Sequence, residues 1–280
     1  MTTRNVCGGW LLAALIMQAL PGYAESKQGE TSMTETTQKI SASEWQALEK
    51  KRVVFGHQSV GWNILNGLER LAARQGIKIN IHEQRTAPVL TGISHFTIGK
   101  NGDPMSKIQD FAAAIDAGAA QGADAALMKL CYVDFDATTD ARQVADSYIA
   151  SLESLAQRHP DTSFVAVTAP LMAVQTGPKA WTKRLMGKQP RGYLDNARRA
   201  EFNTRLRERF LATGRLFDLA RIETESTGKL CTVDVEGKAV EALCPELTDD
   251  GGHLNERGQE LVANALLNFI DSLPAKQTPK

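Results

Sequence analysis

Two short segments far apart in the chain carry side chains that could form a hydrolytic site. Ser59 follows an apolar run at 52–56 and precedes a segment of helical periodicity, so we expect it on a tight strand-to-helix turn. Asp250 stands three residues before His253, which lets its carboxylate reach the imidazole Nδ1 and leaves Nε2 free to face a hydroxyl. The start of a helix also favours developing negative charge. The pattern predicts a catalytic triad of Ser59, His253 and Asp250.

Each of these residues also has a simpler interpretation. Serine is a favoured helix cap, Asp250 stands beside two glycines as in an ordinary turn, and His253 would suit a surface or core position. Metal binding is a further alternative for His253. The remaining histidines near the candidate strands show no recognised ligand spacing, namely His57, His82 and His95. We therefore predict no metal and no cofactor.

Short apolar segments alternate with helix-like segments along the chain. The expected strands are 52–56, 77–81, 123–132, 163–168 and 215–219, and the expected helices include 108–120, 144–158, 197–211 and a closing helix through 261–270. Apolar strands separated by helices indicate a parallel sheet covered on both faces. The predicted fold class is α/β, a flavodoxin-like three-layer α/β/α sandwich around a parallel sheet of about five strands. Ligands in such folds bind beyond the carboxyl ends of the strands, where Ser59 is expected.

The N-terminus has the pattern of an export signal. Arg4 precedes an apolar run at 9–20, and a small-x-small pattern follows at 22–24. A membrane anchor is the alternative, but the run falls short of the about 20 apolar residues that a spanning helix needs. We predict a signal peptide at 1–24, a flexible leader at 25–45, a hydrolase domain at 46–273 and a flexible tail at 274–280. The protein is then periplasmic or secreted, without a stable membrane anchor.

Charge and cysteine content restrict the partners and the compartment. The 32 basic and 32 acidic residues balance, so the overall charge suggests neither nucleic acid nor an anionic bilayer as the main partner. In an oxidising compartment Cys231 and Cys244 are expected to form a disulfide across the base of a small hairpin at 233–240, although two unpaired thiols are the alternative. Cys131 is expected to be buried and free. The oligomeric state is left open.

The candidate residues resemble the SGNH (GDSL) hydrolases over roughly residues 53–270. Asp250-x-x-His253-Leu254-Asn255-x-x-Gly258 is similar to the closing motif of that family, and 196–219 is similar to its last helix–strand unit. The Gly-His-Gln-Ser segment at 56–59 is a looser counterpart of the opening Gly-Asp-Ser. The resemblance implies a Ser–His–Asp esterase or a related acyl transferase that acts on acyl esters of sugars, lipids or small molecules.

The chain departs from this family at the oxyanion-binding asparagine. Val133 stands where the Gly-x-Asn-Asp motif would place that residue, and losing one oxyanion donor typically costs about 10²–10³ in rate. The glycine-rich segment after the second strand offers a replacement, with Gly102 as the best match to the second oxyanion glycine of the family and Asn101 as a side-chain donor. A plain Asn-Gly turn is the alternative. Further candidates for oxyanion or substrate binding are Gly99, Tyr132 and Lys129.

Two other features near the predicted site have no settled role. His57 either lines the pocket or packs beneath the Ser59 turn, and packing is the simpler interpretation. The segment 175–193 is a basic insertion after the fourth strand, either a lid for an acidic or sugar-like substrate or a solvated loop.

Together these features predict an exported serine esterase or deacylase whose substrate is a carbohydrate ester or a small-molecule ester. Two alternatives stay open: a non-catalytic glycan-binding protein that retains the fold, and an O-acyltransferase that uses the same triad.

Overall fold

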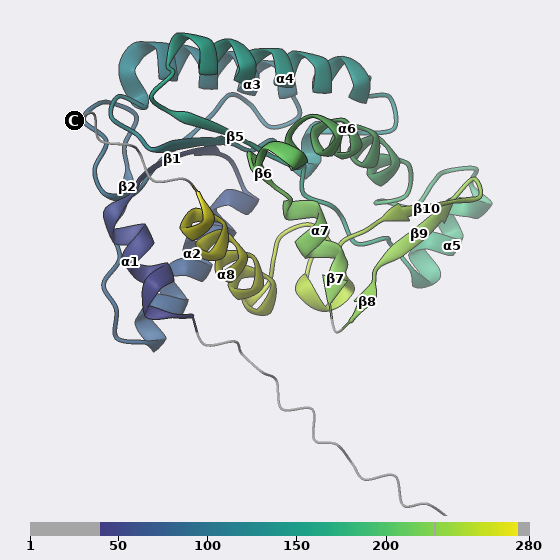
Figure 1. Cartoon of the computed structure of the whole chain (residues 1–280). Coiled ribbons are helices and arrows are strands. Elements are labelled where there is room, and N and C mark those ends of the chain that lie inside the picture. The colour runs from purple at the N-terminus through teal and green to yellow at the C-terminus, as the bar shows by residue number, and fades with distance from the viewer. Residues whose placement is uncertain (1–39, 227, 274–280) are drawn as a thin grey trace, which may run out of the picture. The chain divides into compact units, whose positions relative to one another are not determined.

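The computed structural model describes residues 40–226 and 228–273, which Figure 1 shows in colour. The predicted signal peptide, most of the predicted leader and the tail at 274–280 lie outside these residues. Within the described ranges, no helix is both long enough and apolar enough to cross a membrane.

Six parallel strands form the central sheet in the order β2-β3-β1-β4-β5-β6. Their bounds are Arg52–His57 (β1), Ile81–Glu83 (β2), Gly92–Thr97 (β3), Ala125–Met128 (β4), Ser163–Val167 (β5) and Leu216–Phe217 (β6). The chain runs from β1 out to the edge strand β2, returns to β3 beside β1, and then crosses β1 to continue as β4. The loops after β1, β3 and β4 therefore leave one edge of the sheet at its switch point, where α/β folds bind ligands.

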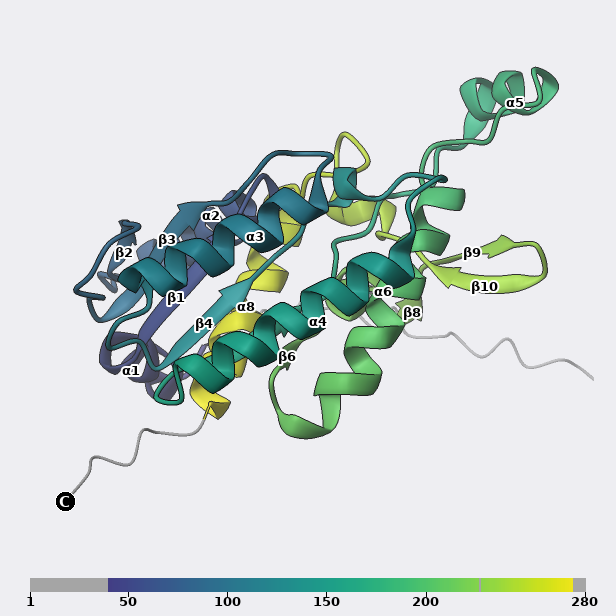
Figure 2. The same ribbon diagram turned by 90° about the horizontal axis from the view of Figure 1, so that it is seen from above.

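Helices cover both faces of the sheet (Figures 1 and 2). One face carries α3 (Pro104–Ala114), α4 (Ala141–Arg158) and α6 (Leu194–Phe210), and the other carries α1 (Ala42–Lys50), α2 (Val60–Arg74), α7 (Leu219–Thr224) and α8 (Glu256–Ser272). The side chains of β1 alternate between two buried clusters, with Val53 and Phe55 in one and Val54 in the other. The predicted three-layer α/β/α class is confirmed, with six strands in place of about five.

Two local predictions need correction. Helix α1 begins inside the segment predicted as leader, because Ser41 and Glu44 form a capping box and Trp45 is 3% exposed, so folded structure reaches back to Ile40. The strand expected at 77–81 begins only at its last residue, since the chain pairs with β3 from Ile81 onward.

Helices α2 and α8 pack closely against each other. A Cβ at Gly67 would lie 2.3 Å from the carbonyl oxygen of Gln259, so this contact requires a glycine. Arg70 donates to Glu256 at 2.6 Å, and the Leu254 N–H donates to Asn63 Oδ1 at 3.2 Å. The loop that precedes α8 is thereby attached to α2.

Two excursions leave the sheet beside its switch edge. Strands β9 (Thr232–Val235) and β10 (Lys238–Glu241) form the predicted hairpin, and the predicted Cys231–Cys244 disulfide is present. Cys131 is free and buried, as expected. A short antiparallel pair, β7 (Glu225–Ser226) and β8 (Lys229–Leu230), precedes the hairpin. The basic insertion is more than a loop, because it contains helix α5 (Gly177–Leu185), which projects away from the sheet in Figure 2.

Candidate active site

Ser59 lies on a sharp turn between β1 and α2. Its φ of 46° and ψ of −102° belong to a region that residues other than glycine seldom adopt, and such strain is common at catalytic turns. The hydroxyl makes no capping bond to α2, so the helix-cap interpretation does not describe this serine. A Cβ at Gly61 would lie 2.3 Å from the His57 ring, which restricts that position to glycine. The turn therefore presents the Ser59 side chain at the carboxyl edge of the sheet.

The structure brings Ser59, His253 and Asp250 into one hydrogen-bonded chain. Ser59 Oγ lies 2.7 Å from His253 Nε2, and His253 Nδ1 lies 2.6 Å from Asp250 Oδ2. The other carboxylate oxygen, Oδ1, accepts from the N–H groups of Gly252 and His253 at 2.8 Å each. Burial alone would raise the pKa of Asp250, but these hydrogen bonds outweigh it and lower the pKa to about 2. The ionised carboxylate therefore holds Nδ1–H and directs the Nε2 lone pair at the serine hydroxyl.

Tyr132 lies beside the imidazole, on the short helical turn that follows β4. Its hydroxyl is 3.3 Å from His253 Nε2 and 3.4 Å from Nδ1, and a Cβ at Gly252 would lie 2.7 Å from its ring. Burial and the nearby negative charge of Asp250 raise the pKa of Tyr132, while the charge of Arg191 and a hydrogen bond with Ser59 oppose that rise. The phenol is therefore protonated at neutral pH and available as a donor at the mouth of the site.

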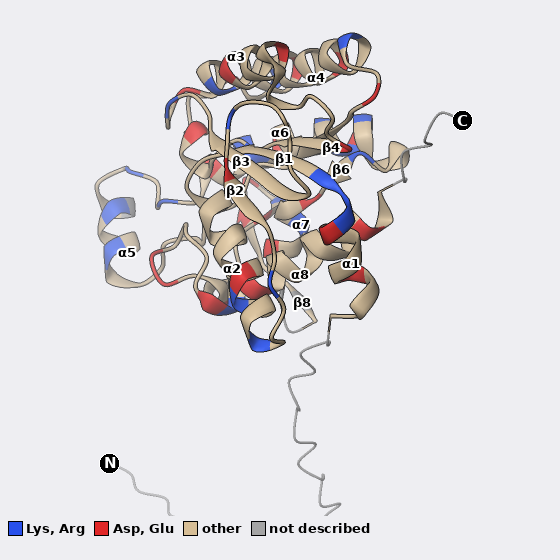
Figure 3. Cartoon of the chain, turned by 90° about the vertical axis from the view of Figure 1, so that its left-hand side faces the viewer, with Lys and Arg blue, Asp and Glu red and all other residues tan. Residues whose placement is uncertain are grey.

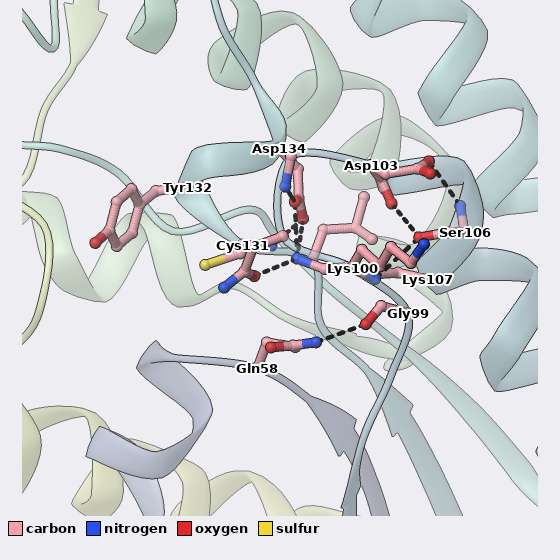
Figure 4. Close-up of polar contacts among 12 residues, drawn as sticks. Gln58, Gly99, Lys100, Asp103, Ser106, Lys107, Cys131, Tyr132 and Asp134 are labelled. Carbon is pink, nitrogen blue, oxygen red and sulfur yellow. Dashed lines mark hydrogen bonds and ion pairs between the residues drawn. The ribbon is translucent and has the colours of Figure 1, made fainter.

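The loop 99–102, which follows β3, lies directly beside the Ser59 turn. Gln58 Nε2 donates to the carbonyl oxygen of Gly99 at 2.8 Å (Figure 4) and to that of Ile98 at 2.9 Å. The Gly99 N–H donates to Asp110 and the Gly102 N–H donates to Asp134, both at 2.9 Å. These two backbone donors are engaged by carboxylates, which corrects the prediction that Gly102 or Gly99 supplies an oxyanion donor.

Asn101 keeps a donor that is not engaged. Its Oδ1 accepts from Lys107 Nζ at 2.9 Å, and its Nδ2 has no hydrogen-bond partner within the described residues. Lys107 Nζ also lies 2.7 Å from both carboxylate oxygens of Asp134, and both side chains of this ion pair are fully buried. A rigid buried pair thus fixes the amide oxygen of Asn101. Val133, at the expected asparagine position, is 43% exposed and contributes only hydrocarbon.

His57 packs beneath the turn and does not line a pocket. The side chain is fully buried, its Nε2 lies 3.1 Å from His95 Nδ1, and the Trp62 ring packs nearly perpendicular to both imidazole rings. Burial first, and then the charges of Lys129 and His95, lower the pKa of His57 to about 2. The ring is therefore neutral, and the interpretation of His57 as a pocket residue is replaced by a supporting role under Ser59.

The buried ionisable groups beneath the site were not predicted from the sequence. Arg199 Nη2 donates to the Tyr132 carbonyl oxygen at 2.7 Å and so fixes the turn that carries Tyr132. Lys129, proposed as an oxyanion donor, is fully buried and donates to the Leu130 carbonyl oxygen at 3.0 Å, which removes it from the site. Glu223 accepts from the Leu171 N–H at 2.6 Å. The position of Lys129 inside an apolar run is the one sequence signal of this cluster.

The chain matches no family model and no curated protein sequence. Among solved structures it is similar to the periplasmic domain of a lipopolysaccharide acetyltransferase from Salmonella ser. Paratyphi A, at 16% identity and a TM-score of 0.45, over 79% of this chain and 84% of that one. A GDSL-like lipase from Bacteroides thetaiotaomicron gives 13% identity and a TM-score of 0.45, over 79% and 88% of the two chains. A psychrotrophic esterase from Pseudoalteromonas sp. gives 10% and 0.42, over 78% and 96%. All three TM-scores lie below 0.5 and all three identities below 25%, so these similarities carry no conclusion about the activity or the substrate of this chain.

Proposed function

We propose that this protein is a serine esterase or deacylase that hydrolyses an acyl ester. Ser59 is the nucleophile, His253 the general base and then general acid, and Asp250 the group that orients and stabilises the imidazole. The observation that carries the proposal is the unbroken chain of short contacts, 2.6 Å from Asp250 to His253 and 2.7 Å from His253 to Ser59. A protein that merely retained the fold for binding has no need of this alignment.

The proposed reaction has two halves. Ser59 Oγ attacks the carbonyl carbon of the ester while its proton passes to His253 Nε2, and the imidazolium then protonates the departing alcohol as the acyl-enzyme forms. Water attacks the acyl-enzyme with His253 as base, and the carboxylic acid leaves as Ser59 regains its proton. The side chains of His253 and Asp250 are 46% and 56% exposed, so water reaches the acyl-enzyme, which favours hydrolysis over transfer to another alcohol.

The developing oxyanion needs donors aimed at it. We assign this role to the Ser59 N–H, which has no backbone partner within the described residues, and to the free Nδ2 of Asn101. The Tyr132 hydroxyl, beside His253, is the third donor in reach of the reacting oxygens. In this assignment Asn101, in the loop after β3, supplies the amide donor that the family resemblance places after β4, where this chain has Val133.

The proposal includes export to the periplasm or the exterior. The basic residue, apolar run and small residues at 1–24 support it, and so does the Cys231–Cys244 disulfide, which suits an oxidising compartment. The substrate is an acyl ester of a carbohydrate or a small molecule. Intact mass of exported protein, with a chain that starts at Glu25, would support this part of the proposal, and recovery of the uncut chain inside cells would contradict it.

The triad is tested with a short-chain aryl ester and a fluorophosphonate probe. Ser59→Ala and His253→Ala should each abolish turnover, and the double variant should be little worse than either, because the members of a triad act as a unit. The probe should label Ser59 in the wild type and label nothing in Ser59→Ala. Ser43→Ala, which removes an exposed hydroxyl of α1, is the matched control and should behave as wild type. Wild-type turnover in Ser59→Ala would exclude the mechanism, and product formed mainly on an added sugar acceptor would assign the chain to the acyl transferases.

A further inference from the structure

Helix α5 presents an apolar stripe that nothing covers within the described part of the chain. Trp181 is 64% exposed and Leu185, one turn further along, is 65% exposed. Residues four apart lie on the same face of a helix, and Met186, 64% exposed, follows directly. Ala180 is buried and marks the side of α5 that faces the body. Large apolar side chains that cluster on a protein surface usually mark a site of interaction.

The charged residues of the chain segment that carries this stripe all have one sign. No acidic residue occurs between Asp161 and Asp195, a stretch with five basic residues: Lys179, Lys183, Arg184, Lys188 and Arg191. In Figure 3 the ribbon of α5 accordingly carries blue segments and no red ones. Lys179 and Lys183 are themselves one turn apart, on a different face from Trp181. An apolar face with tryptophan and leucine beside a lysine-rich face is typical of helices that lie in the interface of an anionic bilayer.

The stem of the insertion is attached to the candidate active site. The Gln175 N–H donates to the Arg191 carbonyl oxygen at 3.0 Å and closes the stem. The Ala173 N–H donates at 3.0 Å to the carbonyl oxygen of Gly251, which lies between the two members of the Asp250–His253 pair. Arg191 also lies close enough to Tyr132 for its charge to lower the pKa of the phenol. A surface that α5 touches is therefore brought next to the catalytic loop.

We propose that α5 docks this protein on the surface of a bilayer that contains anionic lipids. The apolar stripe of Trp181, Leu185 and Met186 enters the interface, and the basic residues of the insertion attract the anionic headgroups. An acidic polysaccharide would satisfy the charges but would leave Leu185 and Met186 in water, whereas a bilayer accommodates both kinds of side chain. Docking rests on α5 alone; the corollary that the substrate is an acyl ester presented at that surface rests also on the proposed function.

The test measures binding to vesicles of phosphatidylcholine alone and of phosphatidylcholine with phosphatidylglycerol, by co-sedimentation at fixed ionic strength. Every protein is made as the same exported chain and carries Ser59→Ala, so that hydrolysis does not alter the lipid and the N-terminus is common to all. We expect binding to the anionic vesicles only. Lys179→Gln with Lys183→Gln should weaken it about thirtyfold, since each basic residue near an anionic surface contributes about fivefold. Trp181→Ser with Leu185→Ser should weaken it at least about tenfold.

Matched controls separate docking from general stickiness and general charge. Leu211→Ser removes an apolar side chain that is 61% exposed elsewhere, and Lys50→Gln with Lys78→Gln removes two exposed charges elsewhere. Both controls should bind as the parent does, and circular dichroism should show the same fold for all variants. Parental binding by the Trp181/Leu185 variant would overturn the proposal, even if the Lys179/Lys183 variant lost binding, because binding by charge alone would mean that the apolar stripe does not enter the interface. An equal loss of vesicle binding in the Lys50→Gln and Lys78→Gln control would also overturn the proposal.

A second readout keeps this inference distinct from the proposed enzyme activity. With Ser59 restored, the α5 variants should hydrolyse a soluble aryl ester at the wild-type rate and lose activity only on an ester embedded in anionic vesicles. Vesicle binding without any esterase activity would contradict the proposed function and leave docking intact. Esterase activity with no vesicle binding would contradict docking and leave the proposed function intact.

Discussion

Substitution of Asn101 tests the oxyanion assignment most sharply, because the structure gives the two ends of its side-chain amide different tasks. Oδ1 accepts from the buried Lys107, and Nδ2 has no partner within the described residues. Asn101→Asp keeps an oxygen for Lys107 and so keeps the loop anchored, but it loses the N–H donor. Asn101→Ala loses both. The pair of variants therefore separates donation to the substrate from support of the loop.

The expected magnitudes differ for catalysis and stability. Loss of one oxyanion donor costs about 10²–10³ in kcat, or about 2.7–4 kcal/mol. The kcat of Asn101→Asp should fall at least as far as that of Asn101→Ala, because a carboxylate beside the developing oxyanion adds repulsion. Stability should drop only in Asn101→Ala, by about 1 kcal/mol, since Lys107 keeps its ion pair with Asp134.

Steady-state hydrolysis of a short-chain aryl ester, together with thermal unfolding, measures both quantities. A donor that acts in the transition state should lower kcat and kcat/KM together and leave KM little changed. Val133→Asn, a substitution at an exposed position, should restore part of the rate to Asn101→Ala by supplying an amide from the other side of the site. Wild-type kcat in Asn101→Asp would refute the assignment and leave Tyr132 as the remaining side-chain donor.

Three further outcomes follow from the same structure. Tyr132→Phe should lower kcat about tenfold with the fold unchanged, because it removes one weak donor beside His253; an unaltered rate would make Tyr132 a packing residue. Cys231→Ser with Cys244→Ser should lose about 3 kcal/mol of unfolding free energy, since the disulfide closes a loop with a sequence separation of 13. An unchanged urea midpoint in this variant would contradict a stabilising role of the disulfide. Burial raises the pKa of Glu223 from 4.5 to about 8. Between these two pH values the folded state holds a proton that the unfolded state has released, so the free energy of unfolding should fall as the pH rises from 4.5 to about 8. Glu223→Gln should flatten that dependence, and an equal slope in the variant would assign it to other groups.

Central strands that are buried on both faces were predictable from the sequence, because they appear as continuous apolar runs, as in β1, β4 and β5. Strand β3 gave no such signal. Its Ser94 and His95 are polar and yet 1% and 3% exposed, and the partner of His95, His57, lies 38 residues away in the sequence. Polar burial of this kind depends on tertiary contacts that no local pattern contains.

The candidate site divides in the same way. Asp250 and His253 were predictable because their spacing is local, and Ser59 because a turn follows an apolar strand. The state of the glycine donors was not predictable, since Gly99 and Gly102 are engaged by carboxylates 11 and 32 residues further along the chain. Which N–H groups remain free is decided by side chains that arrive from other elements of the fold.

The two halves of the proposed relay enter the fold at opposite ends of the chain. Ser59 follows the first strand, whereas His253 is 194 residues further along and precedes the last helix, which packs closely on α2. Contacts of such separation close late, because the loop entropy must be overcome before they form. A chain that emerges from the N-terminus onward therefore carries a serine with no base until α8 has docked. The proposed enzyme would be inert in transit through an export channel, and regain of activity on refolding would time the final closure of the domain.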